Sequence, residues 1–289
     1  IGPVNGVYDI GGGMLKGFYN KVIRDESSAG DFLAWLKPAM AQISSPESEV
    51  ARLNVRVVVA NSALRFLENV EAIVPIDYKY SLAYVGMGKK ERTLDESEQS
   101  SLREAISTAR SSVLLSGKTH RTPDSGYSIK IAKPGRLTPA QRRDIIDLLS
   151  YEEFEYIEQN INDILADETN VIAVCYHGDK IVGIAVAEYK EVQLDSYSRL
   201  HVVEIGDAVT KEEHRQKGIY TALISLLLED AKGSGKFDVI YSEITIEQPG
   251  SLKASVNNGA QFANNNNGKL GILPNDLGGT NLAVAYYQA

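Results

Sequence analysis

The sequence predicts an α+β (α/β) fold whose strands and helices are distributed over two parts of the chain. The 289 residues favour two domains, since a domain usually has about 100 to 200 residues. Short β-branched runs alternate with segments of helical periodicity in both halves. A polar stretch containing Gly, Pro and Ser, Ser116 to Gly126, separates the halves and is the expected linker. We therefore expect an α+β domain over residues 1–120 and a second domain over residues 127–289.

Composition narrows the functional classes. Hydrophobic residues make up 43% and charged residues 24%, as in ordinary globular proteins. No apolar run approaches the roughly 18 residues that span a bilayer, so we expect no membrane partner. The chain begins at Ile1, and whether a leader segment has been removed is left open by the sequence. A net charge of −8 disfavours nucleic acid and favours cationic partners such as amines. The single cysteine, Cys175, fits a reducing cytoplasm.

The first half begins with a glycine-rich segment, Val4 to Gly17, which we expect to be a loop. Apolar residues at helical spacing then predict a helix over Ala29 to Ile43. A β-branched run predicts a strand over Leu53 to Ala60.

The rest of this half is expected to contain a helical segment over Ser62 to Asn69, a strand over Tyr78 to Val85, and a long helix over Leu94 to Leu115. Asp95 or Ser97 would cap that helix. The N-terminal half has no catalytic signature. It could shape an acceptor pocket, mediate dimerisation or bind a partner.

The second half has a distinct order of elements. The expected elements are a strand over Tyr127–Ala132, a helical region from the cap Thr138 and Pro139 to about Leu165, hairpin strands over Asn170–Tyr176 and Lys180–Lys190, a strand over Arg199–Val209, a helix over Tyr220–Lys232, a strand over Val239–Ile246, a short helix over Ser251–Asn258 and a closing strand over Asn281–Tyr287.

The most informative segment joins a strand to a helix through the short loop Arg215 to Tyr220. The first backbone N–H groups of a helix have no intrahelical partner and the helix dipole is positive there, so this position suits a pyrophosphate. Gly218 lets the backbone approach a ligand closely, and Arg215 and Lys217 add positive charge.

This segment resembles the GNAT superfamily of acyl-CoA-dependent N-acyltransferases, whose signature is Arg or Gln, two residues, Gly, one residue, and Gly or Ala. The first four positions match, and Tyr220 replaces the small residue at the last. The resemblance covers roughly Ser128 to Gln288, because the order of elements is also that of the family. It implies a mixed, mostly antiparallel central sheet flanked by helices, and acetyl-CoA (coenzyme A) as cosubstrate with no metal.

The resemblance also implies which residues hold the cofactor. In the family the strand before the loop splays from its neighbour, and its exposed backbone groups pair with the pantetheine arm and with the forming oxyanion. The implied cofactor-binding residues are Ala208, Val209, Thr210, Arg215, Gln216, Lys217, Gly218, Ile219, Tyr220 and Asn257.

An acceptor amine is mostly protonated at neutral pH, so its attack on a thioester requires a base. Glu204 is the first candidate, because part of the family has a glutamate base eleven residues before the arginine of the loop (215 − 204 = 11). Strand alternation groups Glu204 with Gly206 and Ala208 on one face and places the rival Asp207 on the other. Glu243 on the next strand is a third candidate.

The proton donor to the CoA thiolate is less clearly marked. Many family members use a tyrosine on the short helix after the next strand, and Asn257 stands near that position here. Tyr220, Tyr241 or solvent could donate instead, while Asn257 could hydrogen-bond the cofactor. The four histidines show no metal-like clustering, so no metal site is expected.

We therefore expect an enzyme that transfers an acetyl or short acyl group from acyl-CoA to a primary amine of a small molecule or amino acid, directly and in a ternary complex. Two alternatives are an inactive CoA-binding module for sensing or interaction, and an acetyltransferase that acts on a protein amine. A homodimer is left open by the sequence.

Overall fold

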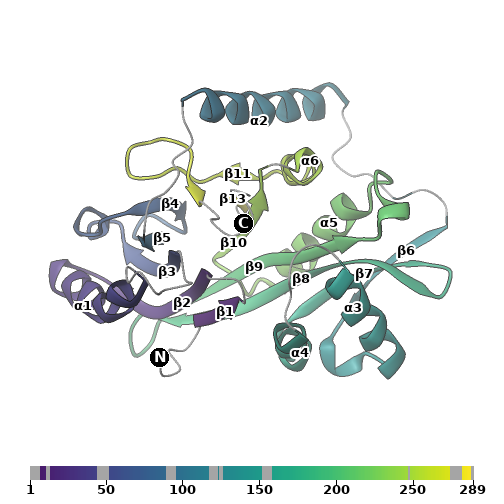
Figure 1. Ribbon diagram of the computed structural model, residues 1–289, viewed down its shortest axis with the longest axis horizontal. Coiled ribbons are helices and arrows are strands. Elements are labelled where there is room, and N and C mark those ends of the chain that lie inside the picture. The colour runs from purple at the N-terminus through teal and green to yellow at the C-terminus, as the bar shows by residue number, and fades with distance from the viewer. Residues whose placement is uncertain are drawn as a thin grey trace.

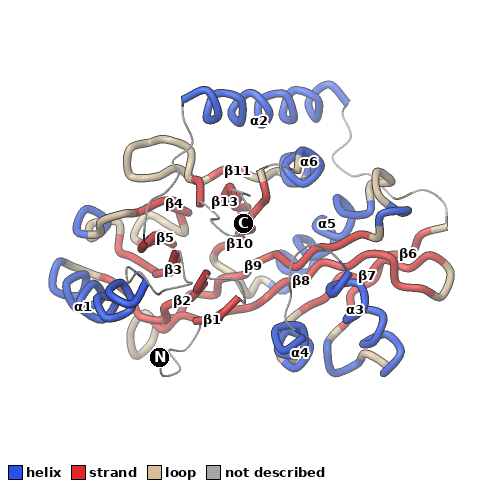
Figure 2. The backbone as a smooth tube through the Cα atoms, viewed as in Figure 1, coloured by secondary structure: helices blue, strands red, loops and turns tan. Residues whose placement is uncertain are grey.

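Two β-sheets form the framework of the protein (Figure 1). The computed structural model describes residues 7–10, 14–43, 52–88, 96–116, 123, 126–151, 158–246, 248–273 and 282–287. The first sheet has five strands in the order β1-β2-β3-β5-β4, and the second has the order β11-β13-β10-β9-β8-β7-β6, with β12 paired to β13. Helices cover both faces of the second sheet (Figure 2).

The N-terminal half supplies the five-stranded sheet and two helices. Its elements are β1 (Val7–Ile10), β2 (Met14–Ile23), α1 (Glu26–Ile43), β3 (Arg52–Ala60), a 3-10 turn (Leu64–Phe66), β4 (Val70–Pro75), β5 (Tyr80–Gly88) and α2 (Glu96–Ser116). Strands β2 and β3 run parallel, while the other pairs of this sheet are antiparallel.

The C-terminal half supplies the second sheet. Its elements are β6 (Tyr127–Ala132), a 3-10 turn (Pro134–Arg136), α3 (Pro139–Tyr151), α4 (Glu158–Ala166), β7 (Val171–His177), β8 (Lys180–Gln193), β9 (Arg199–Thr210), a 3-10 turn (Glu212–His214), α5 (Ile219–Ser234), β10 (Val239–Thr245), α6 (Pro249–Asn257), β11 (Gln261–Phe262), β12 (Ile272–Leu273) and β13 (Leu282–Tyr287). Helix α3 starts where expected, with Thr138 Oγ1 accepting a hydrogen bond from the Gln141 N–H at 3.2 Å.

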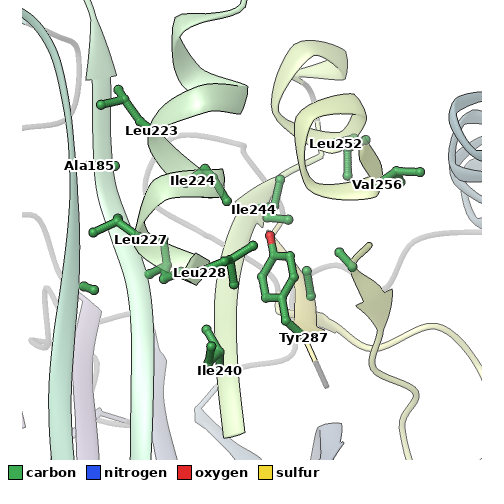
Figure 3. Packing of buried hydrophobic residues seen from close by; sticks show 14 of the residues in the cluster. Ala185, Leu223, Ile224, Leu227, Leu228, Ile240, Ile244, Leu252, Val256 and Tyr287 are labelled. Atoms are coloured by element: carbon green, nitrogen blue, oxygen red, sulfur yellow. The ribbon is translucent and has the colours of Figure 1, made fainter. Parts of the chain in front are cut away.

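The second sheet is antiparallel except at one junction, where β9 and β10 run parallel. Helix α5 connects these two strands and packs, together with α6, on one face of the sheet. Figure 3 shows Leu223, Ile224 and Leu227 of α5 directed toward the strands, with Leu252 of α6 beside Ile244 of β10. Helices α3 and α4 pack on the other face. The predicted α+β fold with a mostly antiparallel sheet flanked by helices is confirmed.

Alternation along β3 gives the N-terminal sheet two different faces. Val55, Val57 and Val59 pack against α1. Arg56 and Val58 point the other way, toward the C-terminal sheet. A shared core therefore joins the halves, and its buried members are Val58, Ala72, Val74, Leu82, Tyr84, Val192, Leu194, Leu200, Val202, Val239, Tyr241, Ala263, Leu273, Leu282, Val284 and Tyr286.

A backbone contact supplements this shared core. The Ile73 N–H of β4 donates to the Asn264 carbonyl at 2.8 Å, forming an isolated bridge between β4 and the loop after β11. Helix α2 lies across α6 at the other end of this region (Figure 1). The division into domains at 1–120 and 127–289 stays a prediction, and most of the expected linker lies outside the described residues.

Two expectations for the first half are wrong. Within Val4 to Gly17, residues 7–10 and 14–17 belong to strands rather than a loop. Pairing of β1 with β2 and of β2 with β3 overrides the low β propensity of glycine. Within Ser62 to Asn69 only a 3-10 turn forms, and the strand β4 that follows was not predicted. No helix in the described parts of the chain is long and apolar enough to cross a membrane.

Leu82→Ala tests whether the halves share a core. Leu82 is fully buried in it, so we expect the free energy of unfolding to fall by about 2 to 5 kcal/mol. Amide hydrogen exchange in β10 should accelerate together with the loss of native fluorescence from Trp35, the single tryptophan.

The matched control is Leu36→Ala, which removes the same atoms from the cluster between α1 and the N-terminal sheet. It should destabilise the region around Trp35 with a smaller effect on exchange in β10. Unchanged exchange in β10 of the Leu82 variant would contradict a shared core.

Candidate functional site

The sheet forks between β9 and β10. The parallel ladder joins Val202, Val203 and Glu204 of β9 to residues 239–241 of β10 and extends no further within the described strands. Beyond that point β9 pairs with β8 up to Thr210, and β10 pairs with β13. The edge of β9 that faces β10 therefore offers backbone N–H and C=O groups to a ligand.

A β-bulge marks the same part of β9. The register with β8 shifts between Val186↔Gly206 and Ile184↔Val209, so that Asp207 and Ala208 lie opposite one residue of β8. Asp207 has φ 44°, in the left-handed region. Ala208 consequently packs toward the α5 side, so the expectation that it shares the face of Glu204 is wrong: alternation does not continue through a bulge.

The loop after β9 leads into a helix whose start has no side-chain cap. Gln216 and Gly218 both have positive φ, at 62° and 78°, and α5 begins at Ile219. Gly218 is the N-cap, which glycine cannot cap with a side chain, and the first helical hydrogen bond runs from the Ala222 N–H to the Gly218 carbonyl at 3.1 Å. Arg215 Nε donates to the Thr210 carbonyl at 3.1 Å and ties the loop to the end of β9. Among the described residues, no side chain caps the N–H groups of the first turn of α5, which begins directly after this loop.

The remaining cofactor candidates lie in β9, α5 and α6. Val209 and Ile219 are buried and support the backbone through packing. Thr210 Oγ1 is buried without a hydrogen-bond partner in the described structure. Asn257 is half-buried at the end of α6.

Lys217 turns toward an aromatic cluster at the sheet edge. Its Nζ donates to the Tyr127 hydroxyl at 3.0 Å and to the Glu213 carbonyl at 3.1 Å. The Tyr127 hydroxyl lies 2.8 Å from His214 Nδ1, and the His177 ring stands 4.9 Å from the Tyr127 ring. Burial and the Lys217 charge lower the pKa of His214, which favours the neutral imidazole.

Tyr220 faces the interior between α5, α6 and β13. Burial raises the pKa of its hydroxyl well above the ordinary value, and Ser251 of α6 is a hydrogen-bond partner. The Tyr220 side chain is thus directed away from the loop, and the raised pKa keeps its hydroxyl protonated and weakly acidic.

A buried cluster of charges lies where the fork begins. Glu204 Oε2 accepts hydrogen bonds from Arg56 Nη1, from Lys190 Nζ at 2.7 Å and from the Tyr241 hydroxyl at 3.0 Å. Arg56 comes from β3 of the N-terminal sheet, and its Nη1 also lies 3.5 Å from Glu243 Oε1. The side chains of Arg56, Glu204 and Glu243 are only 5%, 15% and 9% exposed.

Opposite charges keep the cations of this cluster ionised. Burial opposes the charge of Arg56, but Glu204 is among the neighbours that offset it, and the pKa of Arg56 stays well above its ordinary value. Burial likewise opposes the charge of Lys190, and Glu204 and Glu188 raise its pKa. Burial raises the pKa of Tyr241, so its hydroxyl is neutral.

Glu188 on β8 belongs to the same cluster and was missed from the sequence. It pairs directly with Glu204 across β8 and β9, and its Oε2 lies 3.5 Å from Lys190 Nζ. Burial, with the charges of Glu204 and Asp207, raises the pKa of Glu188 to about 7, although Lys190 and Arg56 oppose the shift. Alternation of Glu188 and Lys190 along β8, set against Glu204 in the antiparallel register, is the signal that could have revealed it.

Arg56 was missed as well. The sequence places it in an apolar strand 148 residues from Glu204, and local pattern cannot show such a contact.

Comparison with known proteins identifies the family of the C-terminal half. Residues 139–254 match the model of the acetyltransferase (GNAT) family. A search of curated proteins found no match.

Among solved structures, Escherichia coli ElaA aligns at 17% identity with a TM-score of 0.42, covering 55% of this chain and 98% of that one. Arabidopsis thaliana NAA60 in complex with acetyl-CoA aligns at 13% identity and a TM-score of 0.45, covering 56% and 98%. The ribosomal-protein-S18-alanine N-acetyltransferase from Escherichia coli gives 13% and 0.43, covering 56% and 94%.

The match to the family model covers α3 through most of α6, which are the elements that build the fork, the bulge and the glycine-capped helix start. The C-terminal half of this chain belongs to the GNAT superfamily.

Proposed function

We propose that this protein transfers an acetyl or short acyl group from acyl-CoA to a primary amine. The observation that carries the proposal is the fork between β9 and β10 combined with the start of α5, which follows Gly218 at the end of the loop after β9. The fork suits an extended arm with amide groups, and the helix start suits a diphosphate. Acyl-CoA has these two parts in this order.

The residues present fit such a ligand. Backbone groups of Ala208, Val209 and Thr210 would pair with the pantetheine arm along the open edge of β9. The N–H groups of the loop and first turn, from Gln216 to Tyr220, would hold the pyrophosphate, with Arg215 adding positive charge. When bound, the cosubstrate supplies an acyl group activated as a thioester.

The chain supports direct transfer without a covalent acyl-enzyme. Cys175, the one thiol in the sequence, is fully buried in β7, and burial raises its pKa to about 11. A thiol in that state is a poor nucleophile. A backbone N–H at the bulge near Val209 would stabilise the oxyanion that develops on the thioester carbonyl.

The acceptor side favours a small cationic amine. Four carboxylates, Glu188, Glu204, Asp207 and Glu243, interact with one another and with two cations, Arg56 and Lys190. The excess of negative charge attracts an ammonium group. The N-terminal sheet reaches this cluster through Arg56 and so borders the acceptor side, which favours a small molecule or amino acid over a folded protein.

The direct test is release of free thiol from acetyl-CoA in the presence of a panel of diamines, amino acids, amino sugars and short peptides. We expect release to depend on the amine, and mass spectrometry should show an acceptor heavier by one acetyl group. Tight binding of CoA without thiol release in the presence of any amine would favour the alternative, a CoA-binding module without transferase activity.

Gly218→Val tests the cofactor site. A β-branched residue at φ 78° strains the loop and displaces the N–H groups that would hold the pyrophosphate. Loss of one charge-assisted hydrogen bond, about 1.5 to 3 kcal/mol, predicts a rise in the Kd for CoA of roughly 10- to 100-fold, measured by calorimetry.

Gly235→Val is the matched control, because Gly235 has φ 60° at the other end of the same helix. It carries similar backbone strain and should leave the Kd within about twofold, which is small on the scale where tenfold is 1.4 kcal/mol. Equal loss of affinity in both variants would attribute the effect to strain and remove the support for a phosphate site at Gly218.

A further inference from the structure

We propose that Glu188 on β8 accepts the proton of the acceptor amine, and that Arg56 of the N-terminal sheet is a positioning residue that fixes Glu204 as a charged neighbour of Glu188. The inference rests on the proposed function and assigns a role to residues of both halves. Glu204, the base expected from the sequence, would then support the base instead of acting as one.

Glu204 is poorly placed to take up a proton. Three donors converge on its Oε2, and they come from three strands: Arg56 from β3, Lys190 from β8 and Tyr241 from β10. Each of these hydrogen bonds favours the carboxylate form, and protonation would weaken all three. The side chain is 15% exposed and acts as the centre of a buried network.

Glu188 is better placed than Glu204 to take up a proton. Its side chain is 27% exposed, and its contact with Lys190 Nζ is longer, at 3.5 Å, than the 2.7 Å contact that the same amine makes with Glu204. Facing positions of an antiparallel pair put their side chains on one side of the sheet, so Glu188 lies beside Glu204. The neighbouring pair on that side, Val186 and Gly206, borders the bulge at Asp207, where the oxyanion N–H is proposed.

Burial and the charges around Glu188 place its pKa near neutral pH. Among the described residues, those acting on it are Lys190 on its own strand, Glu204 and Asp207 on β9, and Arg56 on β3. The two carboxylates and burial favour the protonated form, and the two cations oppose it. The resulting pKa of about 7 lets the group hold a proton briefly and release it to solvent, which suits a general base at neutral pH.

Glu188 takes one proton from the bound ammonium, directly or through one water, and the freed lone pair forms the C–N bond to the acyl carbon. The nitrogen then carries a positive charge and loses a second proton to become an amide. The C–S bond breaks with its electron pair on sulfur, and the thiolate takes up this second proton, relayed by solvent or by Tyr220. Glu188 then returns its proton to solvent.

The decisive experiment compares Glu188→Gln with Glu204→Gln over pH 5 to 9, once an amine acceptor has been found. Glu188→Gln should lower kcat/KM by about 100-fold or more and abolish the rise of kcat/KM near pH 7, with the Kd for CoA unchanged. Glu204→Gln should keep the rise but move it to lower pH, because a negative charge beside Glu188 is lost.

Glu191→Gln is the control, since Glu191 lies on the same strand with its side chain 47% exposed and paired with Arg199. It should behave as the wild type. The reverse result, with the pH-dependent rise abolished in Glu204→Gln and only displaced in Glu188→Gln, would overturn the inference while leaving the proposed function intact. A wild-type protein that releases no thiol from acetyl-CoA with any amine would instead overturn the proposed function, and the inference with it.

The same pH profile tests the positioning role of Arg56. Arg56→Gln should move the rise to higher pH because a cation near Glu188 is lost, and Arg56→Lys should restore it toward the wild-type position. If Arg56→Gln does not fold, as judged by Trp35 fluorescence, the double variant with Glu243→Gln removes the opposite charge at the same time. A rise that stays in place in the folded variant would overturn the positioning role.

Stability offers a readout independent of activity. The pKa of Glu188 is raised in the folded state, from about 4.3 in an unfolded chain, so the native protein holds a proton that the unfolded chain has released. This contribution to stability is fully present below about pH 4.3 and is lost as the pH rises through 7. Glu188→Gln should therefore gain Tm relative to the wild type, by about 2 to 4 °C, between pH 5 and pH 8. A difference in Tm that is the same at both pH values would contradict the shifted titration.

Discussion

The ion pair between Arg56 and the two glutamates of the C-terminal sheet is the constraint on which the arrangement of this site depends. A guanidinium that is 5% exposed must be matched by carboxylates, because an unpaired buried charge is far more costly than a buried apolar group. Glu204 and Glu243 supply that match from adjacent strands, β9 and β10, on either side of the fork. Removing one partner of such a pair typically costs about 3 to 5 kcal/mol, so the N-terminal sheet and the fork constrain each other.

The strands and helices of the C-terminal half could be predicted from the sequence because the patterns that indicate them are local. Strand β6 has the expected bounds. Helix α5 begins at Ile219, one residue before the predicted start and directly after Gly218, the glycine of the loop motif. The anion-binding logic at Gly218 needs only a strand, a loop and a helix in succession. For the same reason, the short segment from Arg215 to Tyr220 was enough to suggest the family resemblance.

The rest could not be predicted because it depends on pairing between distant segments. Strand β2 follows a run of glycines whose propensity argues against a strand, and its parallel partner β3 begins nine residues after α1 ends. The bulge at Asp207 places one extra residue in β9, and nothing in the sequence distinguishes that residue from its neighbours. Alternation was correct up to Gly206 and failed at Ala208. The carboxylate cluster likewise emerged only when β3, β8 and β9 were in register.

The shared core also has a consequence for how this chain could be divided. The C-terminal sheet buries Val202, Val239 and Val284 beneath the N-terminal sheet. A fragment limited to residues 127–289 would lack the N-terminal sheet and would present this valine-rich face to water, as an apolar patch of the kind that drives self-association. The C-terminal half therefore depends on the N-terminal half to cover this apolar face, and also for the cation that Arg56 places beside its glutamates.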